Sequence, residues 1–455
     1  MDYSIDAINS VHPEYQSNIE HWEFLNNSYL GGNHYKSQDY LTKYVFESAG
    51  EYRQRVMNTP LDNHCQSIIN IYNSFIFKEP PVRDFGSIEN SPYLAPFLED
   101  ADYDERSFND FMSEVDRLSA VYGHAWVIVD KPTTEVVTAA DEMYMGIRPY
   151  VSLFAPTAVV DWTYERQANG SYQLTYFKII EAQYDDVVVY KIFTPELIST
   201  VQTKDGKTVI LMDETPNALG YIPAVCVYDT RSPVKGVGVS AISGVAGMQL
   251  SIFSDYSEIE QLIRLSNHPS LVKTKDVDAS AGAGSIITMD DQLDPALKPY
   301  LLQPNAGNLD SIRETIDSKV EAINRMANVG AIRAKETRQM SGVAIDSEFR
   351  NLDARNGKKA KNLALGEENI WQIFCDWIGA EWNGTVTYDD NYNTRDKLTD
   401  LNILKQATIL LPNNEALRDE MAKQIAEMIS EDPDVINSIT GGDNTGLVEE
   451  VVESE

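Results

Sequence analysis

Two segments with an apolar residue at every third or fourth position enclose a short insert, and this arrangement most restricts the fold. The spacing predicts two long amphipathic helices, over residues 238–265 and 309–329. The residues expected to pack along them are Met248, Ile252, Tyr256, Ile259 and Ile263, then Ile312, Ile316, Val320 and Ile323. The insert between them, 266–308, has short strand-like runs among Gly and Pro residues. We therefore expect a packed helical pair that carries a small strand-containing insert.

The residues before this pair predict an α+β region. A helix over "SIINIYNSFI" should end before Pro80 and Pro81, and a second helix should end at Gly123, a residue typical of helix C-termini. The run "HAWVIVD" then predicts a buried strand. Between later strand-like runs, Asp205-Gly206 predicts a hairpin turn.

The second long helix is expected to begin near Ser311, whose spacing to Glu314 fits a capping box. After a gap between Gly330 and Gly342, a third helix continues the apolar pattern, with Gly357 and Gly366 as points where it could bend. Two further helices are expected near the C-terminus. The last 15 residues, "GGDNTGLVEEVVESE", have five acids and no base, which favours a solvated, disordered end over an acidic docking peptide.

The charge is unevenly distributed. The chain has a net charge of −33, yet residues 325–361 have nine basic and four acidic residues, a local +5. Such an acidic chain is a poor candidate for gripping nucleic acid over its whole surface, because that binding relies on Lys and Arg. The acidic net charge does not exclude a protein past which DNA slides. The segment from Arg350 to Lys361 has interleaved acids and is interpreted as a solvated or intersubunit helix surface.

No catalytic constellation is found. The six His residues are scattered, and HExxH, CxxC and GxSxG motifs are absent. His64 is expected on a helix surface beside a buried Cys65 thiol, and three well-separated Cys residues are typical of a reducing compartment. The sequence shows neither a signal peptide at its start nor an apolar run long enough to cross a bilayer. We expect no enzyme activity, no cofactor and no membrane partner.

One weak metal candidate remains. Asp389, Asn391, Asn393 and Asp400 supply oxygen atoms at the first, third, fifth and twelfth positions of a calcium loop. The sixth position, normally Gly, is Thr394. A polar loop before a helix is the alternative interpretation.

The order of these segments resembles the portal (head-to-tail connector) proteins of tailed bacteriophages, over nearly the whole chain. Several runs are similar to the portal pattern, although none is an invariant signature. They are "YLTKYVFESAGEYRQRVMNTPLDN", "IYNSFIFKEPP", "LSAVYGHAWVIVDKP", "GMQLSIFSDYSEIEQLIRLSNHPSLV" and "SGVAIDSEFRNLDARNGKKAKNLALGEENIW".

The resemblance implies a portal-like α+β architecture with named regions. These are a wing over 1–237, stem helices over 238–265 and 309–329, a clip over 266–308, a tunnel loop over 330–344, a long helix and return to the wing over 345–392, a crown over 393–441 and an acidic tail over 442–455. It also implies a ring, usually of twelve copies, at one capsid vertex of a virion assembled in the host cytoplasm. Double-stranded DNA passes through this ring during packaging and ejection. The implied partners are the terminase large subunit, the major capsid protein and the head-tail adaptor.

Under this interpretation, Arg333, Lys335 and Arg338 would contact DNA weakly at the narrowest point of the channel, while the acidic body repels it. Ion pairs between subunits are a rival role for these three residues. Two alternatives remain for the whole chain. One is another virion structural protein, such as a connector or tail component, and the other is a hydrolase or nuclease.

Overall fold

The computed structural model describes residues 3–132, 138–267, 270–272, 294, 300–302, 308–333, 342–389, 422 and 425. The chain divides into two compact units, Met1–Asn391 and Tyr392–Glu455. Only Ala422 and Ile425 of the second unit are described. The expected crown and acidic tail therefore lie outside the described residues, apart from these two positions.

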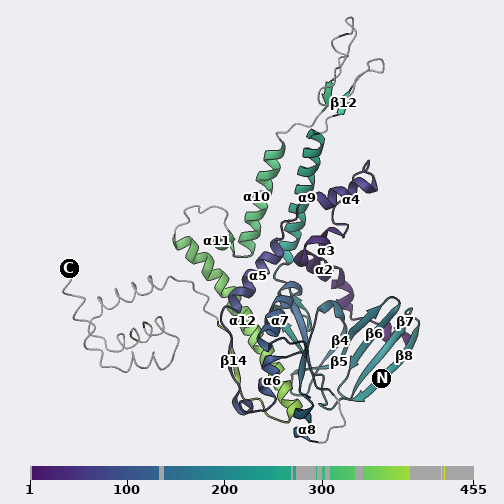
Figure 1. Ribbon diagram of the computed structural model, residues 1–455, viewed down its shortest axis with the longest axis vertical. Helices are drawn as coiled ribbons and strands as arrows, with labels where there is room; N and C mark the ends of the chain where they lie inside the picture. The colour runs from purple at the N-terminus through teal and green to yellow at the C-terminus, as the bar shows by residue number, and fades with distance from the viewer. Residues whose placement is uncertain are drawn as a thin grey trace, which may run out of the picture. The chain divides into compact units, whose positions relative to one another are not determined.

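The first unit mixes helices and sheets (Figure 1), in agreement with the α+β prediction. Its helices before the stem are α1 (Ile5–Asn9), α2 (Pro13–Leu30), α3 (Gly32–Lys36), α4 (Ala49–Asn58), α5 (His64–Ile76), α6 (Leu94–Glu99), α7 (Phe108–Tyr122) and α8 (Ala139–Tyr144). The predicted helix before Pro80 is confirmed as α5. The predicted helix before Gly123 is confirmed as α7, and Gly123 has the left-handed φ of 96°.

The two largest sheets of this unit are antiparallel. One is a five-stranded meander of β4 (Val159–Arg166), β5 (Tyr172–Tyr184), β6 (Val187–Phe193), β7 (Leu197–Lys204) and β8 (Thr208–Pro216). The other has the order β3 (Tyr150–Phe154), β2 (His124–Asp130), β9 (Ala224–Tyr228). The predicted buried strand is confirmed as β2. The predicted hairpin joins β7 to β8, with Asp205 and Gly206 at φ values of 52° and 61°.

A helical pair extends from this unit (Figure 1). The pair consists of α9 (Ser243–Asn267) and α10 (Asn308–Met326), and we call it the stem. Beyond it, β12 (Ser270–Val272) pairs antiparallel with β13 (Tyr300–Leu302) of the same chain.

The capping-box prediction is wrong, since α10 begins at Asn308 and the Ser311 carbonyl accepts a bond from the Thr315 hydroxyl within the helix. Residues 238–239 are not helical either: they form β11 (Gly238–Val239), which pairs with β10 (Thr230–Arg231).

The chain then returns through α11 (Gly330–Arg333) and α12 (Gly342–Ile378) to β14 (Thr385–Thr387), which pairs with β1 (Val82–Asp84). The α12 helix is continuous through Gly357 and Gly366, the two points at which the sequence would allow a bend. The presence of Gly at position 366 is explained by packing instead of bending. A Cβ atom there would lie 2.9 Å from a methyl group of Val227 on β9, so its absence lets α12 approach the three-stranded sheet closely.

One hydrophobic core joins the two sheets to the stem. It includes Trp126 and Trp162 from the sheets, Ile252 from α9, and Ile316 and Ile323 from α10. These side chains are almost completely buried, so the base of the stem is fixed to the mixed domain by shared apolar packing.

Candidate functional site: the stem and the basic segment beside it

The two stem helices contact each other through apolar side chains and one polar clamp. Of the nine residues expected to pack there, Ile252, Ile316 and Ile323 lie in the core cluster, and Met248, Tyr256, Ile259, Ile312 and Val320 are half-buried against it. Ile263 differs, because 40% of it is exposed near the end of α9. The Lys319 ammonium group donates to Ser251 Oγ at 2.7 Å and to the carboxylate of Asp255, both on α9.

The outer face of α10 is mainly acidic, with Arg313 as an exposed cation among its carboxylates. Its exposed carboxylates are Asp310, Glu314, Asp317 and Glu321, which recur at steps of four and three and therefore share one face of the helix. Glu321 also makes a long 3.8 Å contact with Arg325 on the surface. Lys319 lies two residues from both Asp317 and Glu321, about 200° around the helix, so the carboxylates point away from α9.

Arg333, one of the three expected DNA-contacting residues, is half-buried at the end of α11. It donates to Nδ1 of His64 at 2.7 Å and to Oδ1 of Asn324 at 3.2 Å. Burial lowers the pKa of its guanidinium group, and the nearby Asp62 opposes that shift. Arg333 is thus already engaged by its own chain. Lys335 and Arg338 lie outside the described residues.

The prediction that His64 lies on a helix surface is wrong. His64 is 1% exposed, and its Nε2 lies 3.3 Å from the Asp62 carboxylate while Nδ1 accepts from Arg333. It is therefore a linker between α5 and α11. Cys65 is buried as expected, and burial raises the pKa of its thiol to about 12.

In the basic part of α12 the surface interpretation is wrong for Lys359, which is 2% exposed. Its ammonium group lies 2.8 Å from the carboxylates of both Asp116 and Asp229 and donates to the Asp116 carbonyl at 2.9 Å. Arg355, one turn earlier, lies 3.7 Å from Asp229 and 3.5 Å from the centre of the Tyr72 ring. Arg350, Lys358 and Lys361 are exposed on the same helix.

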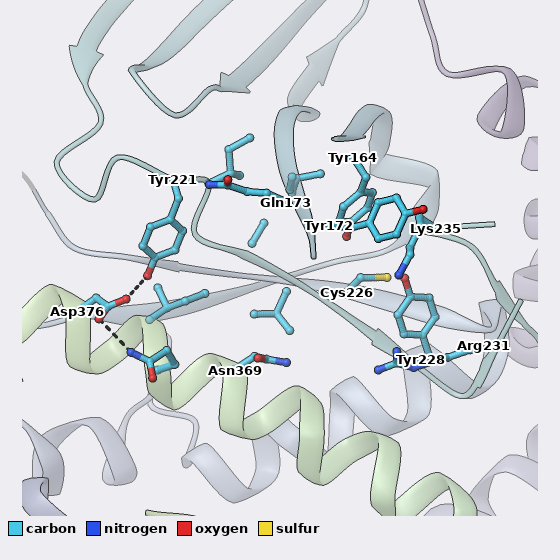
Figure 2. A pocket seen from close by; sticks show the side chains of 16 residues that line it. Tyr164, Tyr172, Gln173, Tyr221, Cys226, Tyr228, Arg231, Lys235, Asn369 and Asp376 are labelled. Carbon is cyan, nitrogen blue, oxygen red and sulfur yellow. Dashed lines mark hydrogen bonds between the residues drawn. The ribbon is translucent and has the colours of Figure 1, made fainter. Parts of the chain in front are cut away.

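A cleft of about 470 Å³ lies between β5, β9 and α12 (Figure 2). At one end, the Tyr221 hydroxyl donates to Asp376, which also accepts from Gln372 at 3.1 Å. At the other end, Lys235 lies 4.6 Å from the centre of the Tyr172 ring, and Arg231 lies 5.2 Å from that of Tyr228.

Cys226 also lines this cleft, and burial raises the pKa of its thiol to about 12. The thiol is therefore protonated near neutral pH and is a poor nucleophile. The residues around the cleft do not form a nucleophile–base pair.

No cluster of three or more His, Cys, Asp or Glu side chains suited to a metal ion occurs in the described part of the chain. Of the weak calcium candidates, Asp389 is described, whereas Asn391, Asn393 and Asp400 lie outside the described residues. No described helix is both long and apolar enough to span a bilayer.

Comparison with known proteins gives matches only among solved structures. No family model and no curated protein matches the chain. Among solved structures, a chain of the native gene transfer agent virion has a TM-score of 0.43 and 10% identity, covering 77% of this chain and 86% of that one. A chain from the neck of the empty particle, computed with C6 symmetry, has a TM-score of 0.45 and 9% identity, covering 82% and 91%. A chain from the native neck, computed with C12 symmetry, has a TM-score of 0.43 and 8% identity, covering 77% of this chain and 86% of that one.

Proposed function

We propose that this chain is the subunit of a ring-shaped portal at one vertex of a virus-like capsid, through which double-stranded DNA passes during packaging and ejection. The observation that carries the proposal is the stem. Two antiparallel helices, joined at their base to an α+β domain, extend to a paired β-segment and return through a short helix to a long one. This is the order that the sequence resemblance to portal proteins implies.

The stem geometry suits a ring of identical copies. A ring repeats one heterologous contact, so a subunit needs two different lateral surfaces that face in opposite directions. The helix α9 has α4 and α10 on its two sides (Figure 1), and its Glu258 accepts from Tyr44 in the loop before α4. A closed circle of such stems would leave a central channel, and twelve copies is the number that the resemblance implies.

The charge also suits passage of DNA without capture. With a net charge of −33, most of the surface repels the phosphate backbone. In this proposal Lys335 and Arg338, between α11 and α12, make the weak and salt-sensitive contacts with passing DNA. Arg333 contributes mainly by holding the start of that segment, since its guanidinium group is bonded to His64 and Asn324.

The terminase large subunit, the major capsid protein and the head-tail adaptor are the proposed partners. By analogy with the portal pattern, the 266–308 insert is the proposed docking region for the terminase and later for the adaptor.

Light scattering of the purified full chain, combined with a DNA-binding titration, tests the proposal. We expect a mass that is a high multiple of the 51.1 kDa chain and weak, salt-sensitive DNA binding at physiological ionic strength. A monomer at all concentrations, or tight sequence-specific binding, would overturn it.

A further inference from the structure

The loop between α3 and α4 presents two apolar side chains to solvent beside the stem. Phe46 is 99% exposed and Val45 is 91% exposed, the largest values among the exposed large hydrophobic residues apart from Tyr144. Exposed apolar side chains are common singly, but an adjacent pair on a fixed support is typical of a contact surface. We call residues 43–46 the apolar tip.

The support of this tip is rigid. Arg55, which is 6% exposed, donates to both carboxylate oxygens of Glu47 at 2.8 and 2.9 Å and to the Thr42 carbonyl at 2.8 Å. Its third nitrogen donates to Ser257 Oγ on α9 at 2.7 Å. Because the loop is already fixed, docking of the apolar tip loses little conformational entropy.

The tip is also fixed to the stem directly. The Tyr44 hydroxyl donates to Glu258 on α9, and the Arg55 guanidinium group lies 4.2 Å from the centre of the Tyr44 ring. Arg264, further along α9, lies 3.4 Å from Glu51 of α4. The tip therefore has a defined height along the stem.

This flank and the α10 flank face in opposite directions. On α9, Phe253 and Ser257 contact the α4 side, and Asp255, which contacts α10, lies about 160° around the helix from both. Glu258, which accepts from Tyr44, lies between these two faces. Figure 1 shows α4 and α10 on the two sides of α9. Opposite lateral faces are what a head-to-tail contact between identical subunits requires.

The two flanks also lie at the same level of the stem. The tip is held at Ser257 and Glu258, and the middle of α10 is held at Asp255 through Lys319. Three residues of helix correspond to about 4.5 Å along the axis. Rotation about a ring axis parallel to the stem preserves this level, so the tip of one copy would meet the middle of α10 in the next copy.

Charges on the two flanks are complementary. Lys43 is exposed within the tip, and Arg53 is exposed on α4. The outward face of α10 has three exposed carboxylates and one exposed cation, namely Glu314, Asp317, Glu321 and Arg313. Short side chains adjoin these carboxylates at Ser318 and Ala322. Opposite charges across the rim of an apolar contact favour one partner and one register.

We propose that the apolar tip docks on the outward face of α10 in the neighbouring copy of this chain, with Phe46 as the main anchor and Lys43 and Arg53 facing the α10 carboxylates. This contact is the repeated lateral interface of the stem. The inference rests on the proposed ring, and it adds which surfaces join one subunit to the next.

The first test replaces the anchor. Val45→Ser with Phe46→Ser should raise the protein concentration at which rings dissociate by about 30-fold or more, the effect expected for removing a central interface residue. Tyr144→Ser is the matched control, because Tyr144 is 93% exposed on α8, away from the tip. Neither variant should change the melting temperature of the subunit measured in dilute, dissociated protein.

The second test identifies the partner. Reversing the tip charges (Lys43→Glu with Arg53→Glu) or the α10 charges (Glu314→Lys with Glu321→Lys) should each weaken the rings by about tenfold or more. Combining all four changes in one chain should restore assembly, because every interface then has both reversed surfaces.

The outcomes separate the two proposals. Wild-type chain that stays monomeric overturns the ring itself and this contact with it. Wild-type rings whose stability is unchanged in the Val45→Ser, Phe46→Ser chain overturn the contact only. The contact is also overturned if the chain with all four charge changes forms rings no more stable than the two separate losses predict. In that case the tip binds a different protein surface.

Discussion

Lys359 and Asp116 form a buried ion pair, with the ammonium nitrogen 2.8 Å from a carboxylate oxygen and side-chain exposures of 2% and 1%. A carboxylate oxygen of Asp229 lies at the same distance from that nitrogen. The pair joins α12 to α7, and Asp229 follows β9 directly. Two residues of the basic segment in this acidic chain, Lys359 and Arg355, are thus structural, because their charges face these buried carboxylates.

Removing this cation should destabilise the fold strongly. Lys359→Met leaves two carboxylates buried without their shared partner, and such a change costs about 3–5 kcal/mol. We expect a clear fall in the melting temperature measured by circular dichroism. Lys358→Met is the matched control, since Lys358 is exposed on the same helix and its loss should change stability by less than about 0.5 kcal/mol. Equal melting temperatures for the two variants would refute the structural role.

Gly366 should tolerate side chains poorly. A Cβ atom 2.9 Å from Val227 forces α12 away from β9, so Gly366→Ala is expected to cost about 1–3 kcal/mol despite the better helix propensity of Ala. Gly247→Ala is the control, because a Cβ atom there meets nothing within 4 Å inside α9. That control should be neutral or stabilising by up to about 1 kcal/mol. Thermal unfolding of both variants measures the difference, and a stabilised Gly366→Ala chain would contradict the packing argument.

His124 should make stability fall at acidic pH. It is fully buried, accepts a bond from the Gly238 amide at 3.2 Å, and burial lowers the pKa of its ring to about 3. A base with a lowered folded-state pKa stabilises the fold above its unfolded pKa of about 6.5 and loses this contribution as pH falls toward the folded value. The loss between pH 7.5 and pH 5 should be about 2 kcal/mol.

The measurement is the stability difference between wild type and His124→Gln, followed from pH 7.5 to pH 5. Gln keeps an acceptor but does not titrate, and the other titrating groups cancel in the difference. We expect the gap between the two proteins to narrow as pH falls. A constant gap would show that His124 does not titrate differently in the folded and unfolded chains.

The three basic residues proposed near the channel should separate into two classes. Arg333→Ala removes the contacts with His64 and Asn324 and should lower the melting temperature of the subunit. Lys335→Ala with Arg338→Ala should leave that temperature unchanged and alter the retention or length of packaged DNA. Packaging assays on both chains test this, and unchanged DNA retention in the Lys335→Ala, Arg338→Ala chain would remove these residues from the mechanism.

Local signals in the sequence predicted the local structure well. Gly123 ends α7, Asp205-Gly206 forms the β7–β8 turn, and the apolar spacing of Ile252, Ile316 and Ile323 matches the faces by which the stem is buried. Each of these depends on residues within a few positions of one another, where backbone preference and helical period decide the outcome.

Long-range partners could not be predicted in the same way. The burial of His64 depends on Arg333, and that of Lys359 depends on Asp116 and Asp229, all distant in the sequence. Charged residues are usually exposed, so the sequence alone favoured a surface position for Lys359. Its burial becomes favourable only because the fold places Asp116 and Asp229 beside it. Ser311 shows a local failure, since its capping spacing occurs inside a helix that begins three residues earlier.

The central claim is that copies of this chain close into a ring around a channel for duplex DNA. Electron microscopy of the purified full chain in negative stain tests it most directly. We expect rings of one size, with the stems on one side and a central hole wide enough for duplex DNA. Monomers, open filaments or closed particles without a hole would contradict it.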